Sequence, residues 1–493
     1  MRVGLRALAA LCLTAVLTAL PAAFLPALLT VFLPSAAHAA GGAELAEAAR
    51  NRNLAAVRTL LQQRADVNAR QPDGGTALHW AVQWDDLPMA ALLVGSGANA
   101  NAANDYGIVP MYQACTNGSA AMVGLLLKSG ANANAVLPSG ETMLMAAARA
   151  GSVEAVTALL ASGASVNAAE KTRGQNALMW AVSERHSDVA RALIEADADI
   201  NARTTSGFTP LLFAAREGDL DTARLLAERG ADVNQAAGDG SSPLLVATVR
   251  GHAGMGIFLL DRGADPNAAG TGYTPLHWAS GIWESLMTKD YTIESGEWST
   301  LGGVVRQREE LIKALVTHGA DVNAPLTRNP PRFGHTFWRM LGGGGLEGGT
   351  PFFVAAMAGD LPIMKLLLAA GANPAIPTRD GTTPLIVAAG LGVVEEETRI
   401  PQSNRIDAIR FLLDLGADVN AANAAGNTAL HAAAFVGFDD VTKFLAGTGA
   451  RLSPKNKRGQ TPLKVAAGIE MTMQVYIHPT TEALLTSLGA TLD

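Results

Sequence analysis

The chain has 493 residues, of which 49% are hydrophobic and only 5% aromatic, and its formal net charge is −7. An acidic balance disfavours nucleic acid and anionic membrane surfaces as partners. Two cysteines are present, Cys12 and Cys115. Because Cys12 lies in an apolar leader, the rest of the chain keeps one thiol and cannot form an internal disulfide.

The segment 1–39 resembles a secretory signal peptide. Arg2 and Arg6 precede an almost wholly apolar run at 7–34, and Ser35-Ala-Ala-His-Ala39 supplies a small-residue cleavage site. We therefore expect a signal peptide at 1–39 and an exported mature chain that starts near Ala40, either periplasmic or secreted. The apolar run is longer than a usual signal core, so an uncleaved segment that anchors the protein in the inner membrane is the alternative.

From Ala40 onward one short phrase, close to Gly-Ala-Asp-Val-Asn, recurs at a nearly constant interval, so that Asn68 is followed by Asn101 and Asn134. A fixed period of this size predicts stacked supersecondary units with an extended surface, not one core around a closed pocket. The copies occupy 64–68, 97–101, 130–134, 163–167, 197–201, 230–234, 263–267, 319–323, 371–375, 416–420, 449–453 and 489–493.

Each repeat contains the signals of two short helices, as residues 205–238 illustrate. Gly207 suits a tight turn, Thr209 can cap a helix with its hydroxyl, and Pro210 fits the first helical position. Apolar residues at helical spacing then form a first helix and, after Gly218, a second one that ends at Gly230. Neither helix can bury its apolar face alone, so neighbouring repeats must supply the cover.

These helix starts resemble the Thr-Pro-Leu-His-x-Ala-Ala motif of ankyrin repeats. The resemblance implies an all-α fold, namely an ankyrin-repeat solenoid of about twelve helix-turn-helix units with β-hairpin loops. It also implies that residues 40–493 form one ankyrin-repeat domain, with Ala43–Asn68 as its N-terminal cap. Clear copies lie at 76–81, 209–215, 274–279, 350–356, 383–389, 428–434 and 461–467, and weaker ones at 109–115, 142–148, 176–182 and 242–248.

The resemblance also assigns roles to two recurring polar residues. In the family the motif histidine bonds the backbone of the next repeat, and it survives here as His79, His277 and His431. An asparagine ends most repeats, and its side-chain amide is expected to bond adjacent loops rather than to form a ladder for ligands. The set is Asn68, Asn101, Asn134, Asn167, Asn201, Asn234, Asn267, Asn323 and Asn420.

The period is stretched at three places, with insertions at about 281–306, 325–349 and 393–404. Insertions in repeat proteins map to loops and often to a binding face. The second insertion interleaves arginines and aromatics, which are typical hot-spot residues at interfaces. It either binds a partner or packs its own aromatics onto the stack. Its candidate binding residues are Arg328, Arg332, Phe333, Phe337, Trp338 and Arg339.

Ankyrin proteins usually bind through loop tips and the exposed side of the first helix, which implies further candidates. By position these are Trp84, Asp105, Tyr106, Phe208, Arg216, Arg250 and Tyr273. Four large aromatics share one register before the motif alanine. They could line the concave face, but packing between repeats is the favoured interpretation. They are Trp80, Trp180, Phe213 and Trp278.

The sequence offers no set of residues for catalysis. The histidines are far apart, no metal-ligand spacing or nucleophile motif occurs, and Cys115 falls on a core position of its repeat. The acidic run Glu395–Glu397 is interpreted as a solvated loop. We therefore expect no catalytic, cofactor-binding or metal site and no enzymatic activity, with a catalytic site under the insertions as a remote alternative.

Together these observations predict an exported, monomeric protein–protein interaction scaffold that binds a partner protein through its concave face and inserted loops. No nucleic acid is expected, and no membrane contact after signal cleavage. Two alternatives remain open at this point. The protein could be an accessory or chaperone-like subunit of an exported enzyme, or a secreted effector that binds host proteins.

Overall fold

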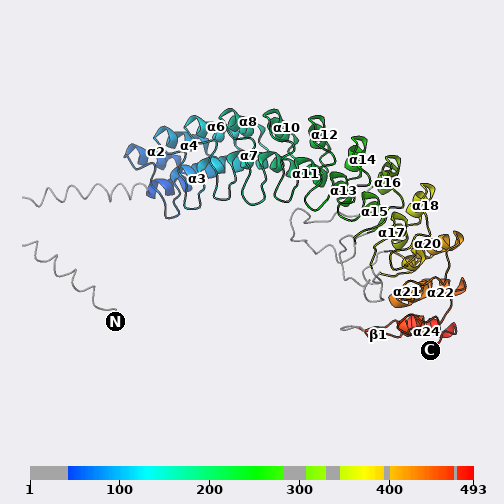
Figure 1. Ribbon diagram of the computed structural model, residues 1–493. Helices are drawn as coiled ribbons and strands as arrows, with labels where there is room; N and C mark the ends of the chain where they lie inside the picture. The colour runs from blue at the N-terminus through cyan, green and yellow to red at the C-terminus, as the bar shows by residue number, and fades with distance from the viewer. Residues whose placement is uncertain (1–42, 283–306, 329–344, 393–399, 471–474) are drawn as a thin grey trace, which may run out of the picture. The chain divides into compact units, whose positions relative to one another are not determined.

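The computed structural model describes residues 43–282, 307–328, 345–392, 400–470 and 475–493. The chain divides into two compact parts, an N-terminal part up to Ala198 and a C-terminal part from Asp199. Each part consists of helix pairs joined by hairpin loops, with inner helices in one row and outer helices in another (Figure 1). The predicted signal peptide at 1–39, the acidic run Glu395–Glu397 and most of the aromatic insertion lie outside the described residues.

The N-terminal part contains five helix pairs. Its inner helices are the helical segment 43–50 together with α3 (Ala77–Gln83), α5 (Pro110–Thr116), α7 (Met143–Ala150) and α9 (Ala177–Ser183). Its outer helices are α2 (Leu54–Gln62), α4 (Leu87–Gly95), α6 (Ala120–Lys128), α8 (Val153–Ala161) and α10 (Ser187–Glu195). Inner helices pack on inner helices and outer on outer along the row, so each repeat is covered by its neighbours.

The C-terminal part contains seven pairs in the same arrangement. Its inner helices are α11 (Pro210–Glu217), α13 (Pro243–Val249), α15 (Pro275–Ser280), α17 (Pro351–Met357), α19 (Pro384–Ala388), α21 (Ala429–Val436) and α23 (Pro462–Ala466). Its outer helices are α12 (Leu220–Glu228), α14 (Ala253–Asp261), α16 (Arg308–Thr317), α18 (Leu361–Ala369), α20 (Gln402–Asp414), α22 (Asp439–Gly447) and α24 (Pro479–Ser487). The described residues of the two parts thus form twelve pairs, which confirms the predicted all-α ankyrin solenoid and its count.

The helices begin and end where the repeat pattern predicts. Thr209 Oγ1 accepts a hydrogen bond from Leu212 N at 3.3 Å, and Pro210 is the first residue of α11. Gly218 ends α11 in the left-handed conformation, with φ +68°, which glycine adopts without steric cost. All residues of Pro210–Ala215 are buried, so almost the whole inner helix lies against neighbouring helices.

Eight of the nine repeated asparagines bond an adjacent loop, as predicted, and Asn201 bonds within its own loop. Asn68 Nδ2 donates to the carbonyl of Gly97 at 3.1 Å, while its Oδ1 accepts from Asn99 N at 2.7 Å. The same pair of bonds recurs along each part of the chain and ties every hairpin of this set to the next. The other asparagines that form both bonds are Asn101, Asn134, Asn234, Asn267, Asn323 and Asn420.

The insertions interrupt the repeat at two kinds of junction. Residues 283–306 and 393–399 connect an inner helix to its outer helix, whereas 329–344 lies within a hairpin. That hairpin is closed at its base, because Leu326 N donates to Gly349 O at 2.9 Å and Gly348 N donates to Leu326 O at 2.7 Å. Leu326, Gly348 and Gly349, which fall within the predicted second insertion at about 325–349, thus form the base of this hairpin.

The third predicted insertion, 393–404, ends in a helix. Gln402 to Asn404 form the first turn of α20, which has 13 residues where α12 has 9 and α16 has 10. Pro401 is the N-cap residue of α20, and proline at a helix start forgoes no intrahelical hydrogen bond. Part of the added sequence is thus extra helix rather than loop.

A fourth extension was missed from the sequence. The stretch from the capping Thr461 to Pro479, where α24 begins, is longer than the corresponding stretch from Thr209 to Leu220, where α12 begins. The added residues include two short antiparallel strands, β1 (Ile469–Glu470) and β2 (Val475–Tyr476), in which Ile469 pairs with Tyr476.

Candidate partner-binding surface

Two arginine–tryptophan pairs lie on the inner helices of the N-terminal part. The guanidinium carbon of Arg50 is 5.3 Å from the ring centroid of Trp80, and that of Arg149 is 4.9 Å from the ring of Trp180. Both distances allow a cation–π attraction. Trp80 and Trp180 are half-buried. Part of each tryptophan therefore faces solvent while an arginine holds it in place.

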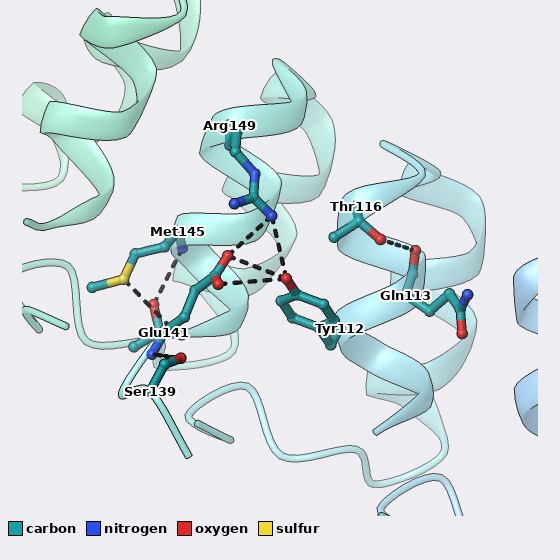
Figure 2. Close-up of polar contacts among 8 residues, drawn as sticks. Tyr112, Gln113, Thr116, Ser139, Glu141, Met145 and Arg149 are labelled. Atoms are coloured by element: carbon teal, nitrogen blue, oxygen red, sulfur yellow. Dashed lines mark hydrogen bonds and ion pairs between the residues drawn. The ribbon is translucent and has the colours of Figure 1, made fainter. Parts of the chain in front are cut away.

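A polar network fixes one of these arginines. Arg149 Nη2, from α7, donates to the hydroxyl of Tyr112 on α5 at 3.2 Å and lies 3.1 Å from Glu141 Oε1 (Figure 2). The Tyr112 hydroxyl in turn lies 3.4 Å from both carboxylate oxygens of Glu141, which precedes α7. The three side chains form a closed triangle (Figure 2). Because Glu141 neutralises the charge of Arg149, this arginine is not a free cation. It is held in place against the ring of Trp180.

Exposed aromatics lie in the same part of the chain. Trp84, at the end of α3, is 41% exposed and its ring stacks against Trp80 with centroids 6.4 Å apart. Its Nε1 donates to the carbonyl of Arg50 at 3.1 Å, so the ring is held although it faces solvent. Tyr106, at a hairpin tip, is 72% exposed beside Asp105, which pairs with Arg70 at 2.9 Å. Trp84, Asp105 and Tyr106 thus lie at the surface, and their contact with a partner stays a prediction.

The C-terminal part has a smaller cluster built in the same way. Arg216, at the end of α11, has its guanidinium carbon 4.9 Å from the Phe213 ring centroid and its Nε 2.7 Å from Glu217 Oε1. Burial lowers the pKa of Arg250. The positive charge of Arg216 adds to this shift, and the negative charge of Glu217 opposes it. These arginines are partly covered, so they offer a partner less surface than Trp84 or Tyr106.

Two predicted surface residues are buried instead. Phe208 is 3% exposed and packs edge-on against Phe213, with centroids 5.6 Å apart, and Tyr273 is 8% exposed and lies 5.9 Å from Trp278. Each directly precedes the helix-capping threonine, a position that folds back over the inner helix. Phe213 and Trp278 are themselves buried, which confirms packing between repeats for these two.

Of the six candidate binding residues in the second insertion, Arg328 is the one that lies in the described part of the chain. Arg328 is exposed, and its backbone N lies 3.3 Å from Gly272 O in the preceding hairpin. The remaining residues of that prediction, Arg332, Phe333, Phe337, Trp338 and Arg339, lie outside the described residues.

The motif histidines bond the next repeat, as predicted. His277 Nδ1 accepts from Thr274 N at 3.2 Å, so Nε2 carries the proton and donates to Gly349 O at 3.2 Å. Burial lowers the pKa of His277 to about 4, and it also lowers the pKa values of His79 and His431. These imidazoles are therefore neutral structural groups at neutral pH.

A second set of histidines was missed from the sequence. His186, His252 and His478 each directly precede an outer helix, and Nε2 of each lies near a carbonyl at the end of the preceding repeat's inner helix. The acceptors are Arg149 O at 3.1 Å, Arg216 O at 3.0 Å and Phe435 O at 2.9 Å. The recurrence of histidine at the start of three outer helices is the signal that could have revealed the set.

Cys115 lies in the core, as predicted. It is fully buried, and burial raises the pKa of its thiol to about 12, which leaves too little thiolate for a nucleophile. Among the described residues, no group of three histidine, cysteine or acidic side chains is arranged to hold a metal ion. A search of the same residues finds no helix with the length and apolarity that a membrane crossing needs.

Comparison with known protein families agrees with this structure. The family described as "Ankyrin repeats (3 copies)" matches residues 45–136, 111–204, 144–237, 211–289 and 399–473, and the family "Ankyrin repeat" matches 271–325 and 347–379. The matches cover well over half of the chain, which therefore belongs to the ankyrin-repeat family. Ankyrin repeats indicate a protein–protein interaction scaffold, and such proteins are generally not enzymes. No curated protein matches the chain.

Proposed function

We propose that this protein is an exported scaffold that binds a partner protein through the inner-helix side of its N-terminal part, the concave face expected from the sequence. The observation that carries the proposal is the set of partly exposed aromatics in that part. Trp84 and Tyr106 are the two exposed aromatics among the described residues. In the same part of the chain, the half-buried rings of Trp80 and Trp180 each lie against an arginine.

The composition of this surface supports binding. Tryptophan, tyrosine and arginine are the residue types that carry most of the energy at protein interfaces. Here they are held before any partner arrives, because Trp84 donates to Arg50 O and Arg149 is fixed by Glu141 and Tyr112. Side chains that are already ordered lose less conformational entropy on binding, which favours affinity.

Charge supports the choice of partner class. Arg149 is neutralised by Glu141, and Arg70 by Asp105. A surface of paired charges and aromatic rings favours a protein segment with apolar and aromatic side chains over a highly charged polymer such as nucleic acid. The insertions at 283–306 and 329–344 are a second proposed contact region, with Arg328 at the edge of the latter.

The proposed export depends on the segment 1–39 alone. If it is removed by a signal peptidase, N-terminal sequencing of the protein from its native host will start near Ala40. An intact Met1 in a membrane fraction would instead support the uncleaved anchor.

The binding proposal is tested by affinity capture from the native envelope fraction, with quantitative mass spectrometry of the captured proteins. The wild type is compared with a Trp84→Ala/Tyr106→Ala double variant and with a Leu492→Ala control, which changes an exposed apolar residue elsewhere. We expect one partner to be lost at least 10-fold with the double variant and retained with the control. Equal capture by all three proteins would contradict the proposal.

The insertion is tested separately by deletion of 329–344, which leaves the closed hairpin base at Leu326 and Gly349 intact. If the insertion contributes to binding, the deletion lowers capture while circular dichroism stays at the wild-type helical content. Full capture by the deletion variant would restrict the proposed site to the aromatic side of the inner helices.

A further inference from the structure

One hairpin of the C-terminal part carries only positive charge. It occupies residues 449–460 and joins α22 to α23. From 441 to 469 the chain contains six lysines and arginines and no acidic residue, and the preceding hairpin at 421–427 has no charged residue. In a chain with a formal net charge of −7, residues 449–460 are therefore a local basic patch, which we call the basic hairpin. Its exposed cations are Arg451, Lys455, Lys457 and Arg458.

The base of the basic hairpin has an arginine where most hairpins have an acceptor. At this position Asp418 accepts a hydrogen bond from the backbone N of Asn420 at 2.8 Å. In the described parts of the chain, nine hairpins close their base with such a bond. Arg451 occupies the corresponding position, and arginine has no acceptor. The cation thus replaces a local stabilising contact and does not provide one.

The tip of the basic hairpin is ordered by neutral groups. The side-chain oxygen of the buried Asn456 accepts from the backbone N of Arg458 and from that of Gln460, both at 3.0 Å. The backbone N of Lys457 donates to Ala425 O in the preceding hairpin at 2.9 Å. The backbone that carries the exposed cations is therefore fixed before a partner arrives, which lowers the entropy cost of binding.

A hairpin of the N-terminal part has cations at corresponding positions but also a counter-charge. Lys171 and Arg173 are exposed in the hairpin at 168–175, and Lys171 N donates to the preceding hairpin at 3.1 Å. Glu170 takes the place of Asn456 there, and its carboxylate accepts from Arg173 N at 2.6 Å. The amide of Asn456 makes the same kind of bond without a negative charge. The basic hairpin therefore lacks the internal counter-charge of this counterpart.

We propose that the basic hairpin binds a short acidic segment of a partner protein. Among the described residues, none of the ion pairs involves Arg451, Lys455 or Lys457. Complementary charge at an interface speeds association and selects the partner. From Lys455 to Arg458 the chain advances three residues, which span at most about 11 Å. This length suits roughly four extended residues that include several aspartates or glutamates.

Two other polyanions fit this surface less well. Residues 449–460 contain no aromatic side chain on which a nucleic-acid base could stack. They also contain no large exposed apolar side chain that could enter a membrane surface. The negative charge of the whole chain repels a long polyanion more than a short peptide. These observations favour a protein segment.

The probe is a fluorescein-labelled peptide of four Glu-Asp repeats, and the full mature chain is used. Fluorescence anisotropy at pH 7.5 measures binding at 50 mM and at 300 mM sodium chloride. We expect saturable binding that is at least about 5-fold weaker at the higher salt concentration, because salt screens exposed charges. A peptide of four Gln-Asn repeats should not bind. No binding of the acidic peptide, or equal binding of both peptides, would overturn the proposal.

Two double variants with the same change of charge make the test specific. Lys457→Glu/Arg458→Glu should weaken binding at least about 10-fold, because like charges then face the peptide. Lys171→Glu/Arg173→Glu is the matched control and should stay within about 2-fold of the wild type, since it changes exposed cations of a hairpin that has its own carboxylate. Circular dichroism checks that both variants fold. Equal losses in the two variants would mean that only the net charge matters and would contradict the proposal.

A third variant separates binding from stability. Arg451→Asn introduces the residue that Asn99 and Asn132 provide at the base of their hairpins. It should weaken binding about 3-fold without lowering the thermal unfolding midpoint, because exposed substitutions change stability little. A variant that binds like the wild type, or that unfolds at a lower temperature, would indicate a structural role for Arg451 and count against the proposal.

The last comparison identifies the class of partner. A single-stranded oligonucleotide with eight phosphates and vesicles of phosphatidylglycerol replace the peptide, and both should bind at least about 10-fold more weakly. Equal or tighter binding of either would overturn the proposal. The Trp84→Ala/Tyr106→Ala variant should bind the acidic peptide as the wild type does, so this surface and the aromatic surface are tested independently.

Discussion

His478 lies directly against Gly437. A Cβ atom built on Gly437 would lie 2.3 Å from the imidazole Nδ1, and the glycine has a φ of +83°. The same relationship joins Gly151 to His186 and Gly218 to His252, with a nearest ring atom at 2.6 Å in both cases. The glycine that ends an inner helix therefore also provides the space for the histidine of the next repeat.

Substitution of this glycine should be unusually destabilising. Gly437→Ala adds steric overlap with His478 to the cost of a left-handed alanine, so we expect a loss of roughly 2–4 kcal/mol in the free energy of unfolding. Gly449→Ala is the control, because Gly449 has φ +95° but nothing within 4 Å of a built Cβ, and should lose about 1 kcal/mol. Urea denaturation measures both, and equal losses would refute the histidine contact.

Two neighbouring asparagines should respond differently to the same substitution. Asn134 Nδ2 donates to Gly163 O at 2.7 Å, so Asn134→Asp removes a donor and places a carboxylate against a carbonyl. We expect a loss of about 1–2 kcal/mol in the free energy of unfolding. The Asn132 side chain accepts from Asn134 N at 2.9 Å, and aspartate takes this role at Asp232. Asn132→Asp should therefore change stability by less than about 0.5 kcal/mol in thermal unfolding.

Stability should fall with pH below about 6.5 because of His277. Its folded pKa of about 4 lies below the ordinary value of 6.5, so the unfolded chain binds a proton that the native protein does not. The stability is thus fully present above pH 6.5 and is lost as pH falls towards 4, by roughly 3 kcal/mol for this residue. Denaturant titrations from pH 4 to pH 8 measure the slope.

The control for this prediction is His277→Gln, which removes the titrating group and should flatten the curve. A residual slope is expected because burial also lowers the pKa values of His79 and His431. An NMR titration that gives His277 an ordinary pKa would show that its imidazole is not buried as the structure has it.

The thiol of Cys115 should be inert in the native protein. Burial raises its pKa to about 12 and excludes reagents. In a Cys12→Ala background, labelling with Ellman's reagent at pH 8 should be at least about 100-fold slower in buffer than in denaturant. A Cys115→Ala variant gives the blank, and rapid labelling under native conditions would mean that α5 opens readily.

The repeat pattern predicted the helices well because each one carries its own start and stop residues. Thr209, Pro210 and Gly218 mark the limits of α11 by local chemistry that needs no knowledge of distant residues. The asparagine and motif-histidine bonds followed from the family resemblance, since both contacts run between adjacent repeats. Cys115 was assigned to the core by its register alone.

Burial of individual aromatics was harder to predict. Phe208 and Tyr273 occupy loop positions by sequence, yet each folds over an aromatic further along the same repeat, Phe213 or Trp278. Such a contact depends on which pairs of side chains fit together in three dimensions. The network that joins Arg149 to Tyr112 was missed for the same reason, because its members come from different repeats.

The hairpin base closed by Leu326 and Gly349 marks where the segment 329–344 joins the stack of repeats. The backbone hydrogen bonds of Leu326 with Gly349 and of Arg328 with Gly272 are made by residues outside the segment 329–344. They do not require a particular length of that segment. A shorter, longer or exchanged segment between Arg328 and Gly345 should therefore leave these hydrogen bonds in place.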